Sequence, residues 1–335
     1  MNAQSLLKKG KDIFARLTIY FFTLLGVISF NFFLIRFLPG GPFESLLAPD
    51  EHTNLILEPM VREKLMAYYQ LDQPLFHQYL HYLFQTLKGD LGFGIYFQKP
   101  VSQLIKEKIP WSLFIIMVSG VIAFIVGLFF SALSALKRHK KLDLILLVFF
   151  LFLSSVPLFL VAMIFLVCFS VKLNWFPLAG AIDVMTELNS ILWIKQVILH
   201  SLGPILVLAF VEAPSLYLVA RSAMFNALDQ PWMEFGFLRG LKLRRIIIAY
   251  LIPAGLAPVI TRLGTHLAFL LAGTIFVEMT FSYPGLGRLL FQAVQLRDYP
   301  VMQGVFLVMT LVVLLMNFVV DISYQWLDPR IGKRE

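Results

Sequence analysis

The sequence predicts an all-α integral membrane protein with about six transmembrane helices, and two features of its composition support this prediction. Hydrophobic residues make up 59% of the chain and charged residues only 14%, whereas a soluble domain carries about 25% charged residues. The apolar residues are gathered in long runs, and about 20 apolar residues suffice for a helix to cross a bilayer. The single cysteine, Cys168, lies in such a run, so no disulfide framework or cysteine-based zinc site is expected within the chain.

Six apolar segments define the expected spans. Because lipid offers no hydrogen-bond partners to a free backbone, segments of this length are expected to be helical. The second has no charged residue between Ser112 and Leu136 and is the cleanest. The fourth is the weakest because it contains His200, Glu212 and two prolines, which interrupt a helical hydrogen-bond ladder. The expected spans cover approximately residues 17–38, 112–136, 144–171, 197–220, 256–280 and 302–323.

Lysine and arginine residues near the span ends predict that both termini are cytoplasmic. With this orientation, the cytoplasmic segments, together with the inner end of the fifth span up to Arg262, contain 17 of the 28 basic residues. The strongest evidence is the cluster Lys137–Lys141, because the rule applies best to short loops. The basic residues between Lys8 and Arg16 precede an apolar stretch that is too long for a signal peptide, so we expect a retained first transmembrane helix.

The spans divide the chain into four regions. The N-terminus and first transmembrane helix occupy residues 1–38, and an outer loop region follows at 39–111. The outer region contains the amphipathic stretch Gln78–Leu87 and is expected to fold as a small helical domain. The transmembrane core covers 112–328 and contains a long cytoplasmic loop, 221–255, before a cytoplasmic tail at 329–335.

The loop at 221–255 is the most informative part of the sequence. Pro231 suits the first turn of a helix, and Gly240 suits its end. A second short helix is expected to expose Lys242, Arg244 and Arg245 and to bury apolar residues that include Ile246. Such an element could insert into a groove of another protein or lie on anionic lipid as an amphipathic hairpin. The apolar surface of the first helix would comprise Met233, Phe235, Phe237 and Leu238.

The spacing within this loop resembles the coupling loop of ATP-binding-cassette (ABC) importer permeases. Glu234 takes the position of the glutamate in their pattern, Gly240 follows six residues later, and Pro253 follows thirteen residues beyond the glycine. Phe235 and Gly236 stand where that pattern has two alanines, which implies a reshaped fit to the ATPase. The resemblance implies that the residues coupled to the ATPase are Glu234, Phe235, Gly236, Phe237, Arg239, Gly240 and Pro253.

Short motifs along nearly the whole chain extend this resemblance to the oligopeptide/dipeptide/nickel branch of these permeases, and to its first permease subunit type. Each tetrapeptide is weak alone, but together they occur in the right order between the expected spans. The motifs are Arg36–Pro42, Leu71–Pro74, Gly89–Gly92, Lys99–Val101, Phe281–Gly287, Arg297–Pro300 and Asp328–Arg330.

The resemblance implies a transport subunit of the bacterial inner membrane and not an enzyme. A second homologous permease would complete the pathway, two cytosolic ATPase subunits would use ATP and Mg²⁺, and an external solute-binding protein would deliver the cargo. The chain itself contains no phosphate-binding loop and is expected to bind no cofactor and no nucleic acid. Short peptides are the first expectation for the cargo, while metal chelates, haem and antimicrobial peptides remain open.

Charged residues within the expected spans are the other candidates for function, because they are expensive in lipid. Glu212 is a candidate for lining the pathway, for an interaction with His200, or for a hydrogen bond between packed helices. Glu278 is expected to have a structural role at an outer gate. Arg262, one turn from His266, is expected to extend toward the membrane surface. No metal site is expected, since only His77 and His81 have suitable spacing.

The alternative function is an ATP-independent secondary carrier. Carriers commonly contain inverted repeats and interior charges that bind the coupling ion. Glu212, Glu278 and Arg262 are too few and too scattered to favour this class. An intramembrane protease is disfavoured as well, because Ser154 and Ser155 have no histidine partner expected at the same depth.

Overall fold

The computed structural model describes residues 18–33, 63, 66–68, 70, 72–182 and 191–327, with side chains throughout except at 267, 268 and 320–327. The motifs at 36–42 and 328–330, Leu71 and the tail at 329–335 lie outside these residues. The chain forms two compact units. One comprises residues 1–108 and 289–314, and the other comprises 109–288 and 315–335.

The first unit joins the helix Thr18–Phe33 to α4 (Leu75–Leu87), which contains the predicted amphipathic stretch. The hydroxyl groups of Ser29 and Tyr79 lie 2.7 Å apart and share a hydrogen bond. Phe32 is fully buried and packs edge-on against Tyr79, with ring centroids 5.3 Å apart. Aromatic packing and one hydrogen bond therefore hold α4 against the first apolar helix.

A small hairpin, absent from the all-helical expectation for the outer loop, completes this unit. Strands β1 (Phe93–Gly94) and β2 (Lys99–Pro100) pair antiparallel before α5 begins at Val101. The Asp298 carboxylate accepts a hydrogen bond of 2.8 Å from the backbone N–H of Tyr96 in the hairpin turn. Burial raises the pKa of Asp298, whereas backbone hydrogen bonds act in the opposite direction. Asp298 therefore fixes the hairpin to the chain segment between α12 and α13.

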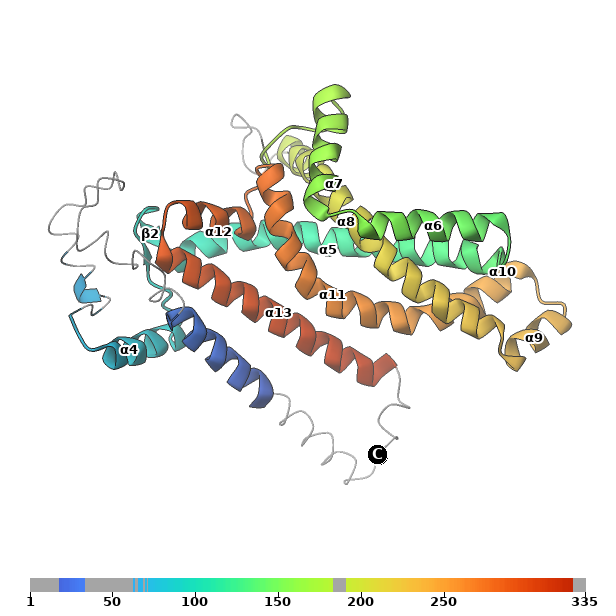
Figure 1. Ribbon diagram of the computed structural model, residues 1–335, viewed down its shortest axis with the longest axis horizontal. Coiled ribbons are helices and arrows are strands. Elements are labelled where there is room, and N and C mark those ends of the chain that lie inside the picture. Colours follow the sequence, from blue (N-terminus) through green and yellow to red (C-terminus); the bar gives the residue numbers. More distant parts are fainter. Residues whose placement is uncertain are drawn as a thin grey trace, which may run out of the picture. The chain divides into compact units, whose positions relative to one another are not determined.

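The second unit contains the long apolar helices α8 and α11 and most of α5, whereas most of α13 belongs to the first unit (Figure 1). Helices α5 and α6 form a helical hairpin, whose turn at 137–140 contains His139 with a φ of 62°. Helix α8 packs against α6, α7 and α11. The helices of the chain after β2 are α5 (Val101–Leu136), α6 (Lys141–Ser155), α7 (Leu158–Phe165), η1 (Leu166–Lys172), α8 (Ile191–Leu228), α9 (Pro231–Leu238), α10 (Leu243–Ile246), η2 (Ile247–Leu251), α11 (Ile252–Thr280), α12 (Leu286–Gln295) and α13 (Tyr299–Leu327).

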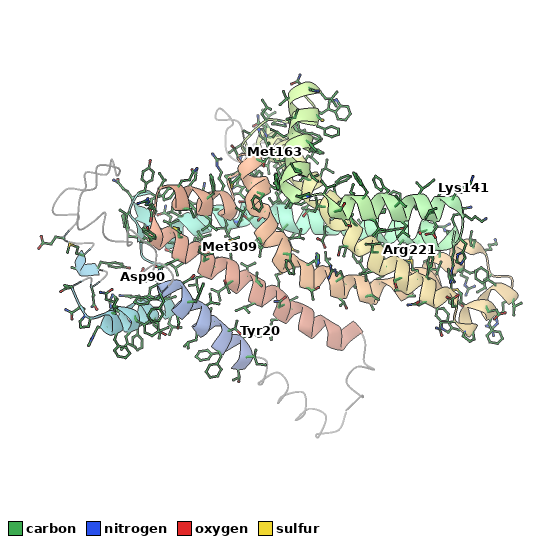
Figure 2. The ribbon with its side chains drawn as sticks, in the orientation of Figure 1. Tyr20, Asp90, Lys141, Met163, Arg221 and Met309 are labelled. Carbon is green, nitrogen blue, oxygen red and sulfur yellow. The ribbon has the colours of Figure 1, made fainter. Side chains whose placement is uncertain are left out.

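Small residues allow the backbones of this unit to approach closely, as is common between helices in membranes. A Cβ atom on Gly127 of α5 would lie only 2.9 Å from the Leu216 Cβ of α8. Large residues fill the remaining core, and the rings of Phe150 and Tyr217 stack with centroids 4.2 Å apart. Many other apolar side chains project outward (Figure 2), and Met163 of α7 is 54% exposed. Since such a surface would be unfavourable in water, these helices fit a lipid environment.

The predicted fold class, an all-α membrane protein, is confirmed. Among the described residues, four helices are long and apolar enough to cross a membrane, or five if α6 and the α7–η1 segment count as one span. The expectation of one regular span at 144–171 was wrong, because the chain bends by 100° between the two helices. Pro157 disfavours helical geometry at Val156, which has an extended ψ of 124°. The predicted fourth span is longer than expected, since α8 continues through both prolines to Leu228.

Candidate functional site

Helix α9 has the boundaries that the sequence predicted. Pro231 occupies its first turn, and Gln230 before it has extended backbone geometry. The helix ends at Leu238, and Gly240 follows with a φ of +67°, a conformation that glycine adopts without strain. The N–H of Gly240 donates to the carbonyl of Phe237 over 2.9 Å, which closes the last turn. Pro231 and Gly240 therefore define a short helix of fixed length.

One face of α9 is buried and the other is apolar and exposed. Met233, expected on the apolar surface, instead points inward, where it is fully buried in the core of the second unit. Gly236 is also on the buried face, while Glu234 and Arg239 are exposed. Exposed apolar side chains of this size are unusual at the end of a helical unit. They are Trp232 at 44%, Phe235 at 62%, Phe237 at 49% and Leu238 at 75% exposed.

The segment after Gly240 anchors α9 to α11. Ile246 is buried and Arg244 and Arg245 are exposed, as predicted. The predicted separate second helix was wrong in one respect, because α10 continues through the π-helical segment η2 directly into α11. Tyr250 in η2 stacks on Trp232 of α9, with ring centroids 6.0 Å apart. Pro253 lies at the start of α11, where a missing N–H is tolerated.

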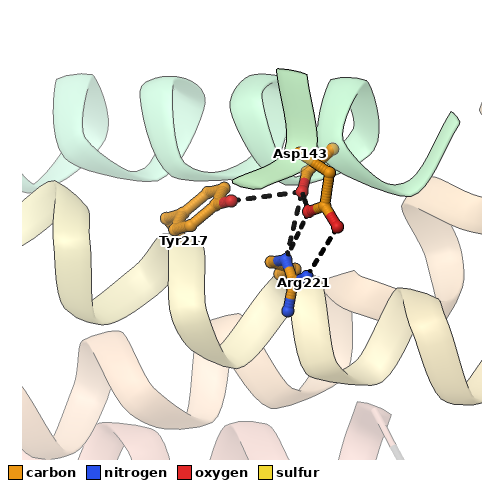
Figure 3. Close-up of polar contacts among 4 residues, drawn as sticks. Asp143, Tyr217 and Arg221 are labelled. Carbon is orange, nitrogen blue, oxygen red and sulfur yellow. Dashed lines mark hydrogen bonds and ion pairs between the residues drawn. The ribbon is translucent and has the colours of Figure 1, made fainter. Parts of the chain in front are cut away.

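An ion pair and its hydrogen bonds join the helices α5, α6 and α8 (Figure 3). Arg221 of α8 donates to Asp143 of α6 from Nε to Oδ1 over 2.8 Å and from Nη2 to Oδ2 over 2.9 Å. Ser134 of α5 donates to the same carboxylate and accepts a hydrogen bond of 3.1 Å from the Tyr217 hydroxyl. We call Ser134, Asp143, Tyr217 and Arg221 the inter-helix clamp. Its side chains are largely buried, so every polar group in it needs these partners.

A second arginine connects the clamp to the start of α9. Arg138, in the turn after α5, forms a two-point ion pair with Asp229, and its Nη2 lies 3.0 Å from Asp229 Oδ2. The hydrogen bond from Arg138 lowers the pKa of Asp229. The guanidinium groups of Arg138 and Arg221 both lie over the ring of Phe225, at 5.1 and 4.1 Å from its centroid. Asp229 stands two residues before Pro231, so these contacts fix the point from which α9 begins.

Sequence reasoning used Arg138 and Arg221 only as topological charges and missed Asp143. One available signal was an acidic residue in the first turn of an otherwise apolar helix. The sequence offered no means to choose its partner, because Arg221 lies 78 residues further along the chain.

Of the contacts considered for Glu212, the structure shows the hydrogen bond between packed helices and not the interaction with His200. Glu212 Oε2 lies 3.2 Å from Nδ1 of His266 on α11, whereas His200 Nδ1 bonds to the Gln196 carbonyl. Arg262, expected to extend toward the membrane surface, instead donates from Nε to Ser215 Oγ of α8 over 2.8 Å. The structure thus brings ionisable residues of α8 and α11 together at one place.

Glu278 is completely buried near the end of α11 and binds the N-terminus of α12. It accepts hydrogen bonds from Ser112 Oγ at 2.6 Å and from the N–H groups of Gly287 and Arg288 at 2.7 and 3.1 Å. A carboxylate at this position satisfies free N–H groups and interacts favourably with the helix dipole. A Cβ atom on Gly285 would overlap the Glu278 carboxylate. The geometry is that of a structural cap, and a role at a gate stays a prediction.

A family profile described as "binding-protein-dependent transport system inner membrane component" matches residues 127–333. Three named relatives resemble the chain over almost its full length. A putative peptide permease protein of Brucella suis is 32% identical, covering 94% of this chain and 97% of the relative. The oligopeptide transport system permease protein AppB of Bacillus subtilis is 32% identical, with coverage of 92% and 95%. The glutathione transport system permease protein GsiC of Escherichia coli K12 is 30% identical, with coverage of 92% and 94%.

A solved structure supports the fold. The inward-facing MetNI methionine ABC transporter contains a chain that matches 68% of this protein and 97% of its own length. The TM-score is 0.55 at 18% identity, which indicates a shared fold and carries no information on the cargo.

Proposed function

Because the chain belongs to the family of inner membrane components of binding-protein-dependent transport systems, we propose that it forms half of the translocation pathway of an importer for short peptides. The predicted resemblance to ABC importer permeases of the oligopeptide/dipeptide/nickel branch is confirmed by the relatives. Two of these relatives are named as peptide or oligopeptide permeases, which supports the proposed cargo class. The observation that carries the proposed mechanism is the exposed apolar face of α9 on a helix anchored to the core.

The exposed face of α9 is suited to insertion into a groove of a cytosolic ATPase subunit. Phe235, Phe237 and Leu238 offer a large apolar area that stays exposed among the described residues, and helices commonly bind to partner grooves through such anchors. Exposed Glu234 and Arg239 add charge at the edge of this face. In the proposed orientation, α9 and both termini are on the cytoplasmic side.

Movement of α9 would be transmitted to the spans through its buried contacts. Met233 packs into the core of the second unit, and Asp229 ties the preceding turn to Arg138. The inter-helix clamp then connects α8 to α5 and α6. A displacement of α9 would therefore move these helices together and would not be absorbed in a flexible loop. In the proposed cycle, ATP closes the ATPase pair, the permeases open outward for cargo, and hydrolysis restores the inward-facing state.

The remaining components are proposed to be separate proteins. A second homologous permease would complete the pathway, an external solute-binding protein would deliver the peptide, and two ATPase subunits would bind ATP and Mg²⁺. This division of labour agrees with the lack of a phosphate-binding loop in the sequence.

Co-purification tests this proposal. The tagged chain is expressed with its neighbouring genes, extracted in mild detergent, and its stoichiometric partners are identified by mass. We expect a second permease and ATPase subunits, and Gly240→Asp should remove the ATPase subunits, because it places a charge beside the docking face. Gly89→Asp is the matched control, since Gly89 has a similar φ of +86° and equally open surroundings. A stable complex without ATPase, or equal loss in both variants, would contradict the proposal.

A further inference from the structure

The ionisable residues shared by α8 and α11 lie near the middle of both helices. Glu212 is in the central part of the 38-residue helix α8, and Arg262 is midway along the continuous helical segment from Leu243 to Thr280. At about 1.5 Å per residue, each helical segment is much longer than the ~30 Å hydrocarbon core of a bilayer. Both residues therefore lie in helices that are long and apolar enough to cross a membrane, where an ionisable side chain is by default a functional candidate.

The contacts within this cluster leave hydrogen-bond donors of Arg262 available for a ligand. The Glu212 side chain is buried and pairs through Oε2 with His266. Arg262 is half-buried, and its Nε is occupied by Ser215. Among the described residues, the two terminal amino groups of Arg262 have no hydrogen-bond partner. Ser215 thus fixes the orientation of the guanidinium group but uses only one of its five N–H donors.

The surroundings of Arg262 suit a ligand that carries an anionic group. The guanidinium group lies within the range of an electrostatic interaction with Glu212. The free edge of a guanidinium group presents parallel donors that match the two oxygens of a carboxylate. His266 lies one turn further along α11, and its ring is 5.5 Å from that of Phe269, which is 72% exposed. A charged donor beside an exposed apolar ring is suited to a peptide end.

We propose that Arg262 binds the C-terminal carboxylate of peptide cargo between the helices α8 and α11, with Ser215 as the positioning residue. This inference rests on the proposed function, because it assumes that α8 and α11 line a pathway for peptides. The peptide carboxylate transiently occupies the free donors of Arg262, while the hydrogen bond to Ser215 keeps the guanidinium group oriented. Arg262 thereby selects for a free carboxyl end in addition to any selection by the external binding protein.

The test compares a peptide with its C-terminal amide in the complete transport complex reconstituted in proteoliposomes. The peptide pair is chosen to bind the external binding protein equally, and ATP-driven uptake is measured for wild type, Arg262→Gln and Arg262→Lys. We expect Arg262→Gln to reduce uptake of the free acid by about tenfold, the loss typical of a missing charge-assisted hydrogen bond, with little change for the amide. Arg262→Lys should retain part of the preference, because it keeps the charge but loses the paired donors.

Arg297→Gln is the matched control, because Arg297 is exposed and lies in a turn outside the spans. It should leave the ratio of acid to amide uptake unchanged. Equal losses for both peptides in Arg262→Gln, in a complex that still purifies intact, would overturn the inference and indicate a structural role. Uptake of both peptides at the wild-type rate by Arg262→Gln would overturn it as well. Absence of ATP-driven uptake of either peptide by the wild-type complex would instead overturn the proposed function itself.

Discussion

Arg221 and Asp143 form a two-point ion pair, 2.8 and 2.9 Å long, that joins the last turns of α8 to the first turn of α6. The side chain of Arg221 is 19% exposed and that of Asp143 is 9% exposed, so neither is fully solvated if the other is removed. Ser134 and Tyr217 complete the hydrogen bonding of the pair. Arg221 is in the last turns of α8, which lead to α9, so substitutions in the clamp test how the start of α9 is supported.

Removal of one partner of the clamp should destabilise the protein. Asp143→Asn leaves Arg221 without its counter-charge, and we expect a loss of about 2 kcal/mol, less than for a fully buried pair because some solvent reaches Arg221. Thermal unfolding in detergent measures the effect, with the exposed neighbour substitution Lys141→Gln as control. The double variant with Arg221→Gln should lose less than the sum of the single variants. Strict additivity would show that the two side chains do not interact.

The exposed phenylalanines of α9 should matter for ATPase binding and little for folding. Phe235→Ala removes an apolar anchor that is 62% exposed, so we expect an unchanged melting temperature and an ATPase affinity at least tenfold weaker. Phe152→Ala is the matched control, because Phe152 on α6 is 66% exposed but distant from α9 in the sequence. Binding of purified ATPase subunits to the detergent-extracted permease gives the measurement. Equal affinities in the two variants would argue against docking through α9.

Gly285 should not tolerate a side chain. A Cβ atom there would overlap the Glu278 carboxylate, which is held by Ser112 and by the N-terminus of α12. We expect Gly285→Ala to lower stability by about 1–3 kcal/mol, the usual effect of overpacking. Gly26→Ala provides the comparison, because the space around Gly26 is open and alanine favours a helix. An equal change of melting temperature in Gly285→Ala and Gly26→Ala would show that the space beside the Glu278 cap is not restricted.

Asp298 should make stability depend on pH in the acidic range. Burial raises its pKa above the ordinary value of 3.8, so the folded state holds this proton more tightly than the unfolded state does. Stability from this group is therefore greatest below the ordinary value and decreases as the pH rises through the raised pKa. Asp298→Asn removes the titration and should flatten that part of the profile of melting temperature against pH. An identical slope in wild type and variant would assign the dependence to other groups.

Much of the α9 region could be predicted from local sequence. Pro231 begins the helix and Gly240 ends it, since each residue constrains its own backbone without help from distant contacts. The all-helical membrane class followed from apolar runs for the same reason, because lipid leaves few alternatives for an apolar backbone. The bend at Pro157 was missed because the apolar composition is the same on both sides of it.

The polar contacts were decided by tertiary structure. The sequence offered His200, on the same helix, as one partner for Glu212, but the carboxylate meets His266 on α11, which is 54 residues away in the sequence. Asp143 meets Arg221 across 78 residues for the same reason. A sequence states which residues carry charge, and in an apolar chain it indicates that each charge needs a partner. Which partner it finds depends on the packing of helices against one another, and that packing is determined by shape and small residues such as Gly127.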